Sequence, residues 1–220
     1  MGRVNPMVLP GVYAPQEDTE LLAGVLCDEP LPPGAAVLDV GTGSGALALR
    51  AARLGARVTA VDVSRRAVYA ARLNARRAGL PVRVRRGNLF EPVRGESFDL
   101  ILANPPYVPA PDGGARPRGA ARAWDAGPDG RLILDRICRE GPALLRPGGV
   151  LLIVQSALSD PGRTVGLLRE ADLKAAVIRR RRISLGPVLR GRERWLRQRG
   201  LLSPEENKEE LVVVRAELPV

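Results

Sequence analysis

The segment Asn104-Pro105-Pro106-Tyr107 carries the most specific chemical pattern in the sequence, directly after an apolar run at residues 98–102. That run predicts a buried strand that leads into this segment. Each proline fixes φ and removes a backbone donor, so the Asn104 side-chain oxygen and the Pro105 carbonyl become two acceptors at a fixed separation. Such a pair can hold both N–H groups of a planar –NH₂. Tyr107 would add an aromatic wall for a flat amide or base.

A glycine-rich turn follows an earlier apolar run at residues 35–39. Gly41, Gly43 and Gly45 allow the backbone to turn tightly and to approach a ligand closely. Asp62 ends the next predicted strand, 21 residues after Gly41, where a carboxylate can accept both hydroxyls of a ribose. The arrangement fits a dinucleotide or S-adenosylmethionine, and tight packing of the turn without a ligand is the alternative.

Two features of this turn favour S-adenosylmethionine over a dinucleotide. The glycines are spaced G-x-G-x-G rather than G-x-G-x-x-G. Asp39 also precedes Gly41 by two residues. Its negative charge would repel a pyrophosphate there, whereas it would attract the ammonium group of the sulfonium cofactor.

The composition excludes several classes of mechanism. The chain has 220 residues, no histidine and two cysteines, Cys27 and Cys138. Without histidine, no imidazole can act as a base or a metal ligand, and we expect no metal site. The cysteines lie far apart without a C-x-x-C pair, so we expect a cytoplasmic protein rather than a disulfide scaffold or a zinc finger. No apolar run is long enough to span a membrane, and no membrane contact is expected.

Apolar runs and helical patterns alternate along the chain. Strands are predicted at residues 35–39, 57–61, 82–84, 98–102, 150–154, 174–178 and 211–218, and helices between them include 18–28, capped by Asp18 or Thr19, and 129–145. This order predicts an α/β fold in one domain, residues 1–220, with a doubly wound, mostly parallel seven-stranded sheet. Such a sheet binds ligands at the carboxyl ends of its strands.

The positive charge is concentrated near the C-terminus. The net charge is +10, and residues 179–199 hold nine arginines against one acid, Glu193, which amounts to +8. Residues 179–210 interrupt the alternation of strands and helices, and they are predicted to form an excursion between the last two strands. This arginine-rich segment would contact RNA phosphates or an acidic partner, or it would be a solvated surface.

Three segments together resemble a known family. Asn104–Tyr107, residues 39–45 and Asp62 resemble class I S-adenosylmethionine-dependent methyltransferases that act on planar amino groups. Residues 12–19 (VYAPQEDT) and 123–130 (AWDAGPDG) are similar to segments of HemK/PrmC-type protein-(glutamine-N5) methyltransferases. The resemblance covers residues 12–154 and is to the short branch, in which no N-terminal helical domain precedes the catalytic domain.

The resemblance implies roles for particular residues. Residues 1–30 would cover the cofactor, with Thr19 at its methionine end, and Asp62 would hold the ribose. Val63 would lie beside the adenine, and Asn88 and Leu89 would meet its edge and face. The implied cofactor site is Thr19, Asp39, Gly41, Gly43, Asp62, Val63, Asn88, Leu89 and Asn104. The implied catalytic residues are Asn104, Pro105 and Tyr107.

One position departs from the family pattern. Ala126 stands where the family usually has a glycine in the loop after N-P-P-Y. If that site requires a positive φ, an alanine there would be strained, and the geometry of the substrate loop would differ.

The resemblance implies methyl transfer from S-adenosylmethionine to N5 of the glutamine in the Gly-Gly-Gln loop of a peptide chain release factor. The alternative is N6 of adenine in RNA or DNA, because that amino group has the same planar shape and residues 179–199 are basic. A non-catalytic, cofactor-binding scaffold is a third possibility. Relatives in the short branch also imply a small zinc-binding activator protein as a partner.

Overall fold

The computed structural model describes residues 6–111, 121 and 123–220. The strands in this part of the chain are β1 (Ala36–Val40), β2 (Arg57–Asp62), β3 (Val82–Arg86), β4 (Phe98–Ala103), β5 (Leu145–Ser156), β6 (Lys174–Ser184) and β7 (Lys208–Glu217). The α-helices are α1 (Glu17–Asp28), α2 (Ala46–Arg53), α3 (Arg65–Ala78), α4 (Leu134–Glu140), α5 (Pro161–Glu170) and α6 (Pro187–Gln198).

All these strands belong to one sheet, in the order β3-β2-β1-β4-β5-β7-β6. The pairs among β1 to β5 are parallel, whereas β7 runs antiparallel to both β5 and β6. The predicted α/β fold with a seven-stranded, mostly parallel sheet is therefore confirmed. The strand order reverses between β1 and β4, which is where such sheets bind ligands.

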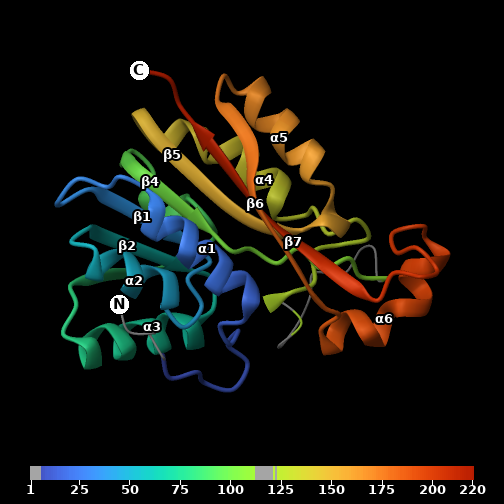
Figure 1. The fold of residues 1–220 in the computed structure, drawn as a ribbon. Coiled ribbons are helices and arrows are strands. Elements are labelled where there is room, and N and C mark those ends of the chain that lie inside the picture. The colour runs from blue at the N-terminus through green and yellow to red at the C-terminus, as the bar shows by residue number, and fades with distance from the viewer. Residues whose placement is uncertain (1–5, 112–120, 122) are drawn as a thin grey trace.

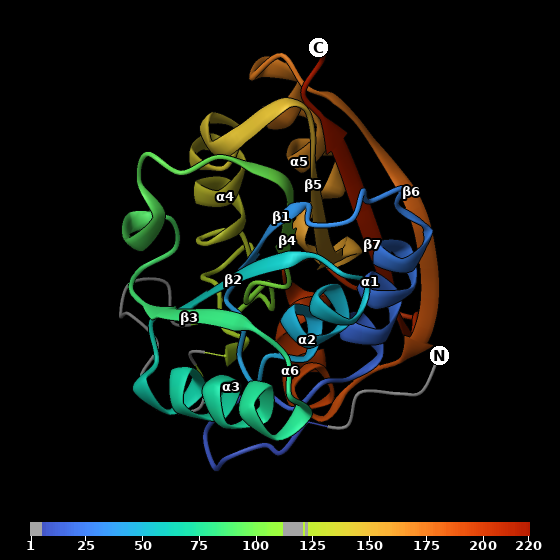
Figure 2. The same ribbon diagram turned by 90° about the vertical axis from the view of Figure 1, so that its left-hand side faces the viewer.

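Helices cover both faces of the sheet. Figures 1 and 2 show α1, α2 and α3 on one face and α4 and α5 on the other, with α6 beyond the end of β6. β5 is buried between these layers, and Leu151, Leu152, Ile153 and Val154 are fully inaccessible to solvent. Aliphatic side chains form most of this core, as the low aromatic content requires. None of the described helices is long and apolar enough to cross a membrane.

The predicted boundary of the arginine-rich segment is wrong at its start. β6 continues to Ser184, so Arg179, Arg180, Arg181 and Arg182 lie in a strand that pairs with β7. An edge strand accepts such a sequence because backbone hydrogen bonds to β7 hold it while its side chains face solvent. The predicted end at residue 210 is also too late, because β7 begins at Lys208. The excursion between the two strands is therefore shorter and consists mainly of α6.

Two predicted helices also differ from the structure in their bounds. α1 begins at Glu17, after Gln16, and no side-chain cap forms there; Asp18 and Thr19 therefore lie inside the first turn instead of capping it. α4 begins only at Leu134 and already ends at Glu140, and β5 begins at Leu145, where the helix was predicted to end. Residues 128–129 and 132–133 form turns instead of helix, and just before them the Gly127 carbonyl accepts from the Ala110 N–H in the loop after β4, at 2.9 Å.

Candidate active site

The glycine-rich turn after β1 has the backbone shape that only glycine adopts freely. φ is +73° at Gly41, +56° at Gly43 and +87° at Gly45, in the left-handed region that a Cβ disfavours. The Gly41 N–H donates to the carbonyl of Val61, at 2.9 Å, which holds the turn against the end of β2. A Cβ on Gly45 would lie 3.2 Å from Cβ of Ala71. The turn is therefore tight and packs closely on α3.

Asp39 is a buried carboxylate with one unused oxygen. Its Oδ2 accepts from Thr42 Oγ1 at 2.6 Å and from the Ala48 N–H at 3.0 Å, whereas Oδ1 has no hydrogen-bond partner among the described residues. Burial raises the pKa of Asp39 to about 6; the hydrogen bonds from Thr42 and Ala48 oppose the rise, and the charge of Asp62 adds to it. An unsatisfied buried oxygen is costly, so the site fits a ligand that brings a cationic donor.

Asp62 stands at the carboxyl end of β2, where both of its oxygens are oriented by the backbone. The Gly43 N–H donates to Oδ2 at 2.9 Å, and the Ser64 N–H donates to Oδ1 at 2.8 Å. Burial raises the pKa of Asp62, although the backbone hydrogen bonds from Ser64, Gly43 and Val63 act against the rise. Each oxygen retains a lone pair, and the half-buried side chain can accept from two neighbouring hydroxyls.

The predicted adenine residues lie at the ends of β2 and β3, which are adjacent strands. Val63 is 50% exposed although it is apolar. Leu89 has a φ of +49°, which is uncommon for a non-glycine residue and often marks a functional constraint. Asn88 is already engaged, because its side chain bonds to Glu91 and to Arg136, both at 3.1 Å.

The Asn104 side chain lies against the start of α1. Its Nδ2 donates to Thr19 Oγ1 at 3.1 Å, and a Cβ on Gly41 would approach the Asn104 carbonyl to 4.0 Å. The structure thus brings together Thr19, the glycine-rich turn and the loop after β4. Because Nδ2 faces Thr19, the acceptor Oδ1 is directed away from it.

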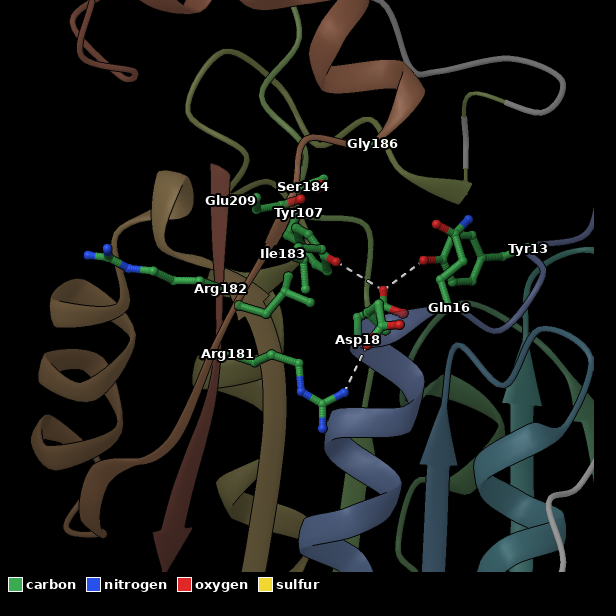
Figure 3. Close-up of a pocket in the computed structure, with 12 residues that line it drawn as sticks. Tyr13, Gln16, Asp18, Tyr107, Arg181, Arg182, Ile183, Ser184, Gly186 and Glu209 are labelled. Atoms are coloured by element: carbon green, nitrogen blue, oxygen red, sulfur yellow. Dashed lines mark hydrogen bonds and ion pairs between the residues drawn. The ribbon is translucent and has the colours of Figure 1, made fainter. Parts of the chain in front are cut away.

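Asp18 is a site residue that sequence analysis treated only as a helix cap. It is buried in the first turn of α1, and its Oδ2 accepts from the hydroxyls of Tyr13 at 2.8 Å and Tyr107 at 2.9 Å (Figure 3). Its Oδ1 accepts from the N–H of Thr19 at 2.6 Å and from its Oγ1 at 3.2 Å. The sequence signal for this role was the presence of Tyr13 and Tyr107 in the two segments that meet at Asp18.

Tyr107 is a hydrogen-bond donor in this structure. Its ring is only 8% exposed. Burial, and then the negative charge of Asp18, raise the pKa of Tyr107 well above its ordinary value, so the hydroxyl remains protonated. The hydrogen bond to Asp18 positions the loop after β4, while the predicted role as an aromatic wall stays a prediction.

A second loop supports the N-P-P-Y segment. The Val108 N–H donates to the Trp124 carbonyl at 2.8 Å, and the Ala126 N–H donates to the Val108 carbonyl at 3.1 Å. Ala126 is fully buried, and it is not among the described non-glycine residues with positive φ. The anticipated strain at this alanine is therefore absent, because the left-handed positions of the loop are Gly127 and Gly130.

α6 contributes one arginine to the same loops. Arg192 donates from Nη1 to the Pro109 carbonyl at 2.9 Å and forms an ion pair with Asp125 at 2.6 Å. Neighbouring arginines of β6 are also paired, Arg179 with Asp28 and Arg181 with Glu17. Much of the predicted basic surface is thus engaged in ion pairs within the protein.

The N-terminal segment runs over the glycine-rich turn. The Met7 N–H donates to Asn74 Oδ1, and Asn74 Nδ2 donates to the carbonyls of Met7 and Ser44, each at 2.9 Å. A Cβ on Gly43 would lie 3.9 Å from the Tyr13 carbonyl. Residues 1–5 lie outside the described part of the chain, and the cofactor-covering role of residues 1–30 stays a prediction.

We expect Gly130→Ala to destabilise the protein more than Gly127→Ala does. Both glycines have positive φ, +71° and +82°, which costs an alanine about 1–2 kcal/mol. At Gly130 the new Cβ would also lie 2.3 Å from the Tyr107 carbonyl oxygen, whereas at Gly127 its nearest neighbour is at 3.9 Å. The clash should lower the free energy of unfolding by a further 1–3 kcal/mol or so. Urea unfolding measures both variants, and equal losses would contradict the close approach.

Comparisons with known proteins agree with this geometry. Residues 6–113 match the family model described as Methyltransferase small domain. The chain is 36% identical over 175 residues to the "Putative protein N5-glutamine methyltransferase" of Methanocaldococcus jannaschii, covering 79% of this chain and 87% of that protein. It is 40% identical over 197 residues to the release factor glutamine methyltransferase of Moorella thermoacetica, covering 85% of this chain and 67% of that protein.

The fold also matches solved structures. The E. cuniculi Mtq2–Trm112 complex, responsible for methylation of the termination factor eRF1, aligns with a TM-score of 0.67 and 24% identity over 94% of this chain and 99% of that chain. The sheet order, the glycine-rich turn, the N-P-P-Y segment and these relatives lead to one assignment. The chain belongs to the HemK/PrmC-type glutamine methyltransferases, which are class I S-adenosylmethionine-dependent N-methyltransferases.

Proposed function

We propose that this enzyme methylates N5 of the glutamine in the Gly-Gly-Gln loop of a peptide chain release factor. The observation that carries the proposal is the position of Asn104 beside both Thr19 and the glycine-rich turn. This supports the proposal that Asn104 and Pro105 act as an acceptor pair next to the methionine end of the cofactor. The names of the bacterial relatives support a release factor as the substrate.

The residues at the carboxyl ends of β1 to β3 fit S-adenosylmethionine, which supplies the methyl group when it is bound. The unpartnered Oδ1 of Asp39 matches the cofactor's ammonium group. The two oriented oxygens of Asp62 match the ribose hydroxyls. Val63, Asn88 and Leu89 would contact the adenine.

The mechanism depends on how the enzyme holds a weak nucleophile. An amide nitrogen reacts poorly because its lone pair is delocalised into the carbonyl. Hydrogen bonds from its N–H groups to Asn104 and Pro105 would orient the amide and favour positive charge on the nitrogen as the new bond forms. Fixed acceptors of this kind stabilise a transition state without reorganising, and alignment for in-line attack adds to the rate. The proton can leave to water afterwards.

Asp18 sets the orientation of the Asn104 amide through Thr19. The Thr19 hydroxyl donates its proton to Asp18 Oδ1, at 3.2 Å, so it can only accept from Asn104. Asn104 must therefore present Nδ2 to Thr19, and its oxygen is left for the substrate. Asp18 is in this sense a positioning residue, and Asn104 is a catalytic residue.

Asn104→Ala should abolish methylation while the affinity for S-adenosylhomocysteine stays within a few fold. The side chain is proposed to act on the substrate amide, most strongly in the transition state. Single-turnover assays and calorimetry measure the two quantities separately. A loss of cofactor affinity as large as the loss of turnover would show that Asn104 is mainly a cofactor residue.

Asp62→Ala should weaken S-adenosylhomocysteine binding about tenfold or more, because two charge-assisted hydrogen bonds to the ribose are lost. Asp99→Ala is the matched control. Asp99 also accepts a backbone N–H, from Ala36 at 2.7 Å, but it lies at the opposite end of the parallel strands. Calorimetry should show near-normal affinity for the control, and an unchanged affinity for Asp62→Ala would refute the assignment.

The assay that tests the function offers labelled S-adenosylmethionine to purified release factor and, separately, to total RNA. Label should enter the release factor and be lost when its Gly-Gly-Gln glutamine is replaced by alanine. Label in RNA alone would favour N6 of adenine as the target. The arginine-rich segment is the feature that keeps this alternative open, since planar amino groups of glutamine and adenine fit the same acceptors.

A triple substitution on α6 and at the residue that caps its C-terminus distinguishes these substrates further. Arg190, Arg194 and Arg199 are exposed, and we expect their replacement by glutamine to change release-factor methylation less than about tenfold, as for charges at an interface rim. For an RNA substrate, each lost phosphate contact would instead reduce the log–log salt slope of binding by about 0.7–0.9. Binding titrations over a range of salt concentrations measure the slope.

A small zinc-binding activator and a cytoplasmic location are also part of this proposal. Support for a partner comes from the similar fold of Mtq2, which was solved in complex with Trm112. Contact between RNA and residues 179–199 belongs to the alternative function.

A further inference from the structure

A pocket of about 510 Å³ lies beside the N-P-P-Y segment. Tyr13 and Asp18 line it from the N-terminal segment and the start of α1, Tyr107 from the loop after β4, and Glu209 from β7 (Figure 3). We call it the Glu209 pocket. Asp18 belongs both to this pocket and to the hydrogen-bond chain that ends at Asn104, so the pocket adjoins the proposed amide site.

Glu209 is the residue whose hydrogen bonding is incomplete. It is 6% exposed, and its Oε1 has no hydrogen-bond partner among the described residues. Burial raises the pKa of Glu209 to about 7; a hydrogen bond with Ser156 opposes the rise, and the charge of Asp18 adds to it. A buried carboxylate oxygen without a donor is costly, and Glu209 has no role in the mechanism described above.

The charged groups around Glu209 do not offset the cost of burying its carboxylate. Arg181 is paired with Glu17 at 2.9 Å, and the Arg182 guanidinium points away from Tyr107 and Asp18 in Figure 3. Asp18 already accepts hydrogen bonds from two tyrosines and from Thr19. The pocket therefore combines three carboxylates, Glu17, Asp18 and Glu209. Glu17 is paired with Arg181 and Glu209 keeps a free acceptor, and no cation among the described residues is paired with Asp18 or Glu209.

We propose that the Glu209 pocket binds a basic side chain of the substrate protein, close in sequence to the target glutamine. An ammonium or guanidinium group would donate to Oε1 and offset the cost of burying the charge, and charge-assisted hydrogen bonds of this kind are the strong ones. A neutral amide N–H would satisfy the oxygen but leave the charge uncompensated. The inference rests on the proposed function and specifies which glutamines the enzyme would select.

The test uses paired synthetic peptides that contain Gly-Gly-Gln. In each pair one flanking position carries arginine or its neutral isostere citrulline, and the position is moved along the peptide from pair to pair. For the wild type, we expect one position at which arginine lowers KM about tenfold or more relative to citrulline, with kcat little changed. Glu209→Gln should remove this difference, because it keeps the shape of the side chain and removes its charge.

Glu210→Gln is the matched control. Glu210 neighbours Glu209 in β7 but forms an ion pair with Arg180, at 2.6 Å, outside the pocket, so its replacement should preserve the arginine preference. Thermal unfolding and S-adenosylhomocysteine binding check that both variants fold. A Glu209→Gln enzyme that slows equally on arginine and citrulline peptides would show a merely structural role and overturn the proposal.

The wild type alone provides a second measurement. The arginine preference should grow as the pH rises through about 7, since Glu209 then loses its proton. Burial raises the pKa of the facing Tyr13 and Tyr107 above their ordinary values, so their hydroxyls stay protonated over this range. The other charged groups that line the pocket are Glu17, Asp18, Arg181 and Arg182. The ratio of the paired peptides cancels any pH effect on cofactor binding, to which Asp39 contributes.

The outcomes separate the two proposals. If the wild type methylates glutamine peptides but never distinguishes arginine from citrulline, the pocket inference fails and the proposed function stands. If no glutamine peptide accepts a methyl group and RNA does, the proposed function and the pocket inference fail together.

Discussion

The active site depends on one buried carboxylate, Asp18, and the hydroxyl groups that donate to it. Tyr13 and Tyr107 donate to one oxygen and Thr19 to the other. The carboxylate lies in the first turn of α1, where the helix dipole favours a negative charge. The N-terminal segment and the start of α1, which adjoin in sequence, thus meet the distant loop after β4 at one anion.

Under the proposed function, this arrangement would let a chain without histidine position a planar amide. Each donor around Asp18 has one available proton, so the direction of every hydrogen bond in the chain from Tyr107 to Asn104 is determined. In that proposal, the side-chain oxygen of Asn104 is left for the substrate. Catalysis by positioning needs this kind of rigidity more than it needs a base.

Close packing of the backbone around the glycines maintains the same geometry. The glycine-rich turn approaches both α3 and the loop after β4, and Gly130 leaves room for the Tyr107 carbonyl. Arg192 of α6 joins the loops on the other side through Pro109 and Asp125. α6, which lies in the segment predicted to contact RNA or an acidic partner or to be a solvated surface, therefore supports the loops after β4.

The sequence alone determined the fold and the chemistry of single segments. Alternating apolar runs are local signals, and they predicted the parallel sheet because buried strands and amphipathic helices leave few other arrangements. The N-P-P-Y segment and the G-x-G-x-G turn could also be recognised from local sequence. Proline restricts the backbone and glycine frees it wherever they occur.

Only the tertiary structure decided how residues far apart in the chain share protons and charges. The sequence predicted Asp18 as a helix cap. In the structure it accepts a hydrogen bond from Tyr107, which lies 89 residues later in the chain. From the sequence, Arg179 to Arg182 were interpreted as part of a basic excursion. In the structure they belong to a strand that pairs with β7, and Arg179, Arg180 and Arg181 form ion pairs with acidic residues. Glu209 has no motif at all, because an unpaired buried oxygen is a property of its surroundings and not of its neighbours in sequence.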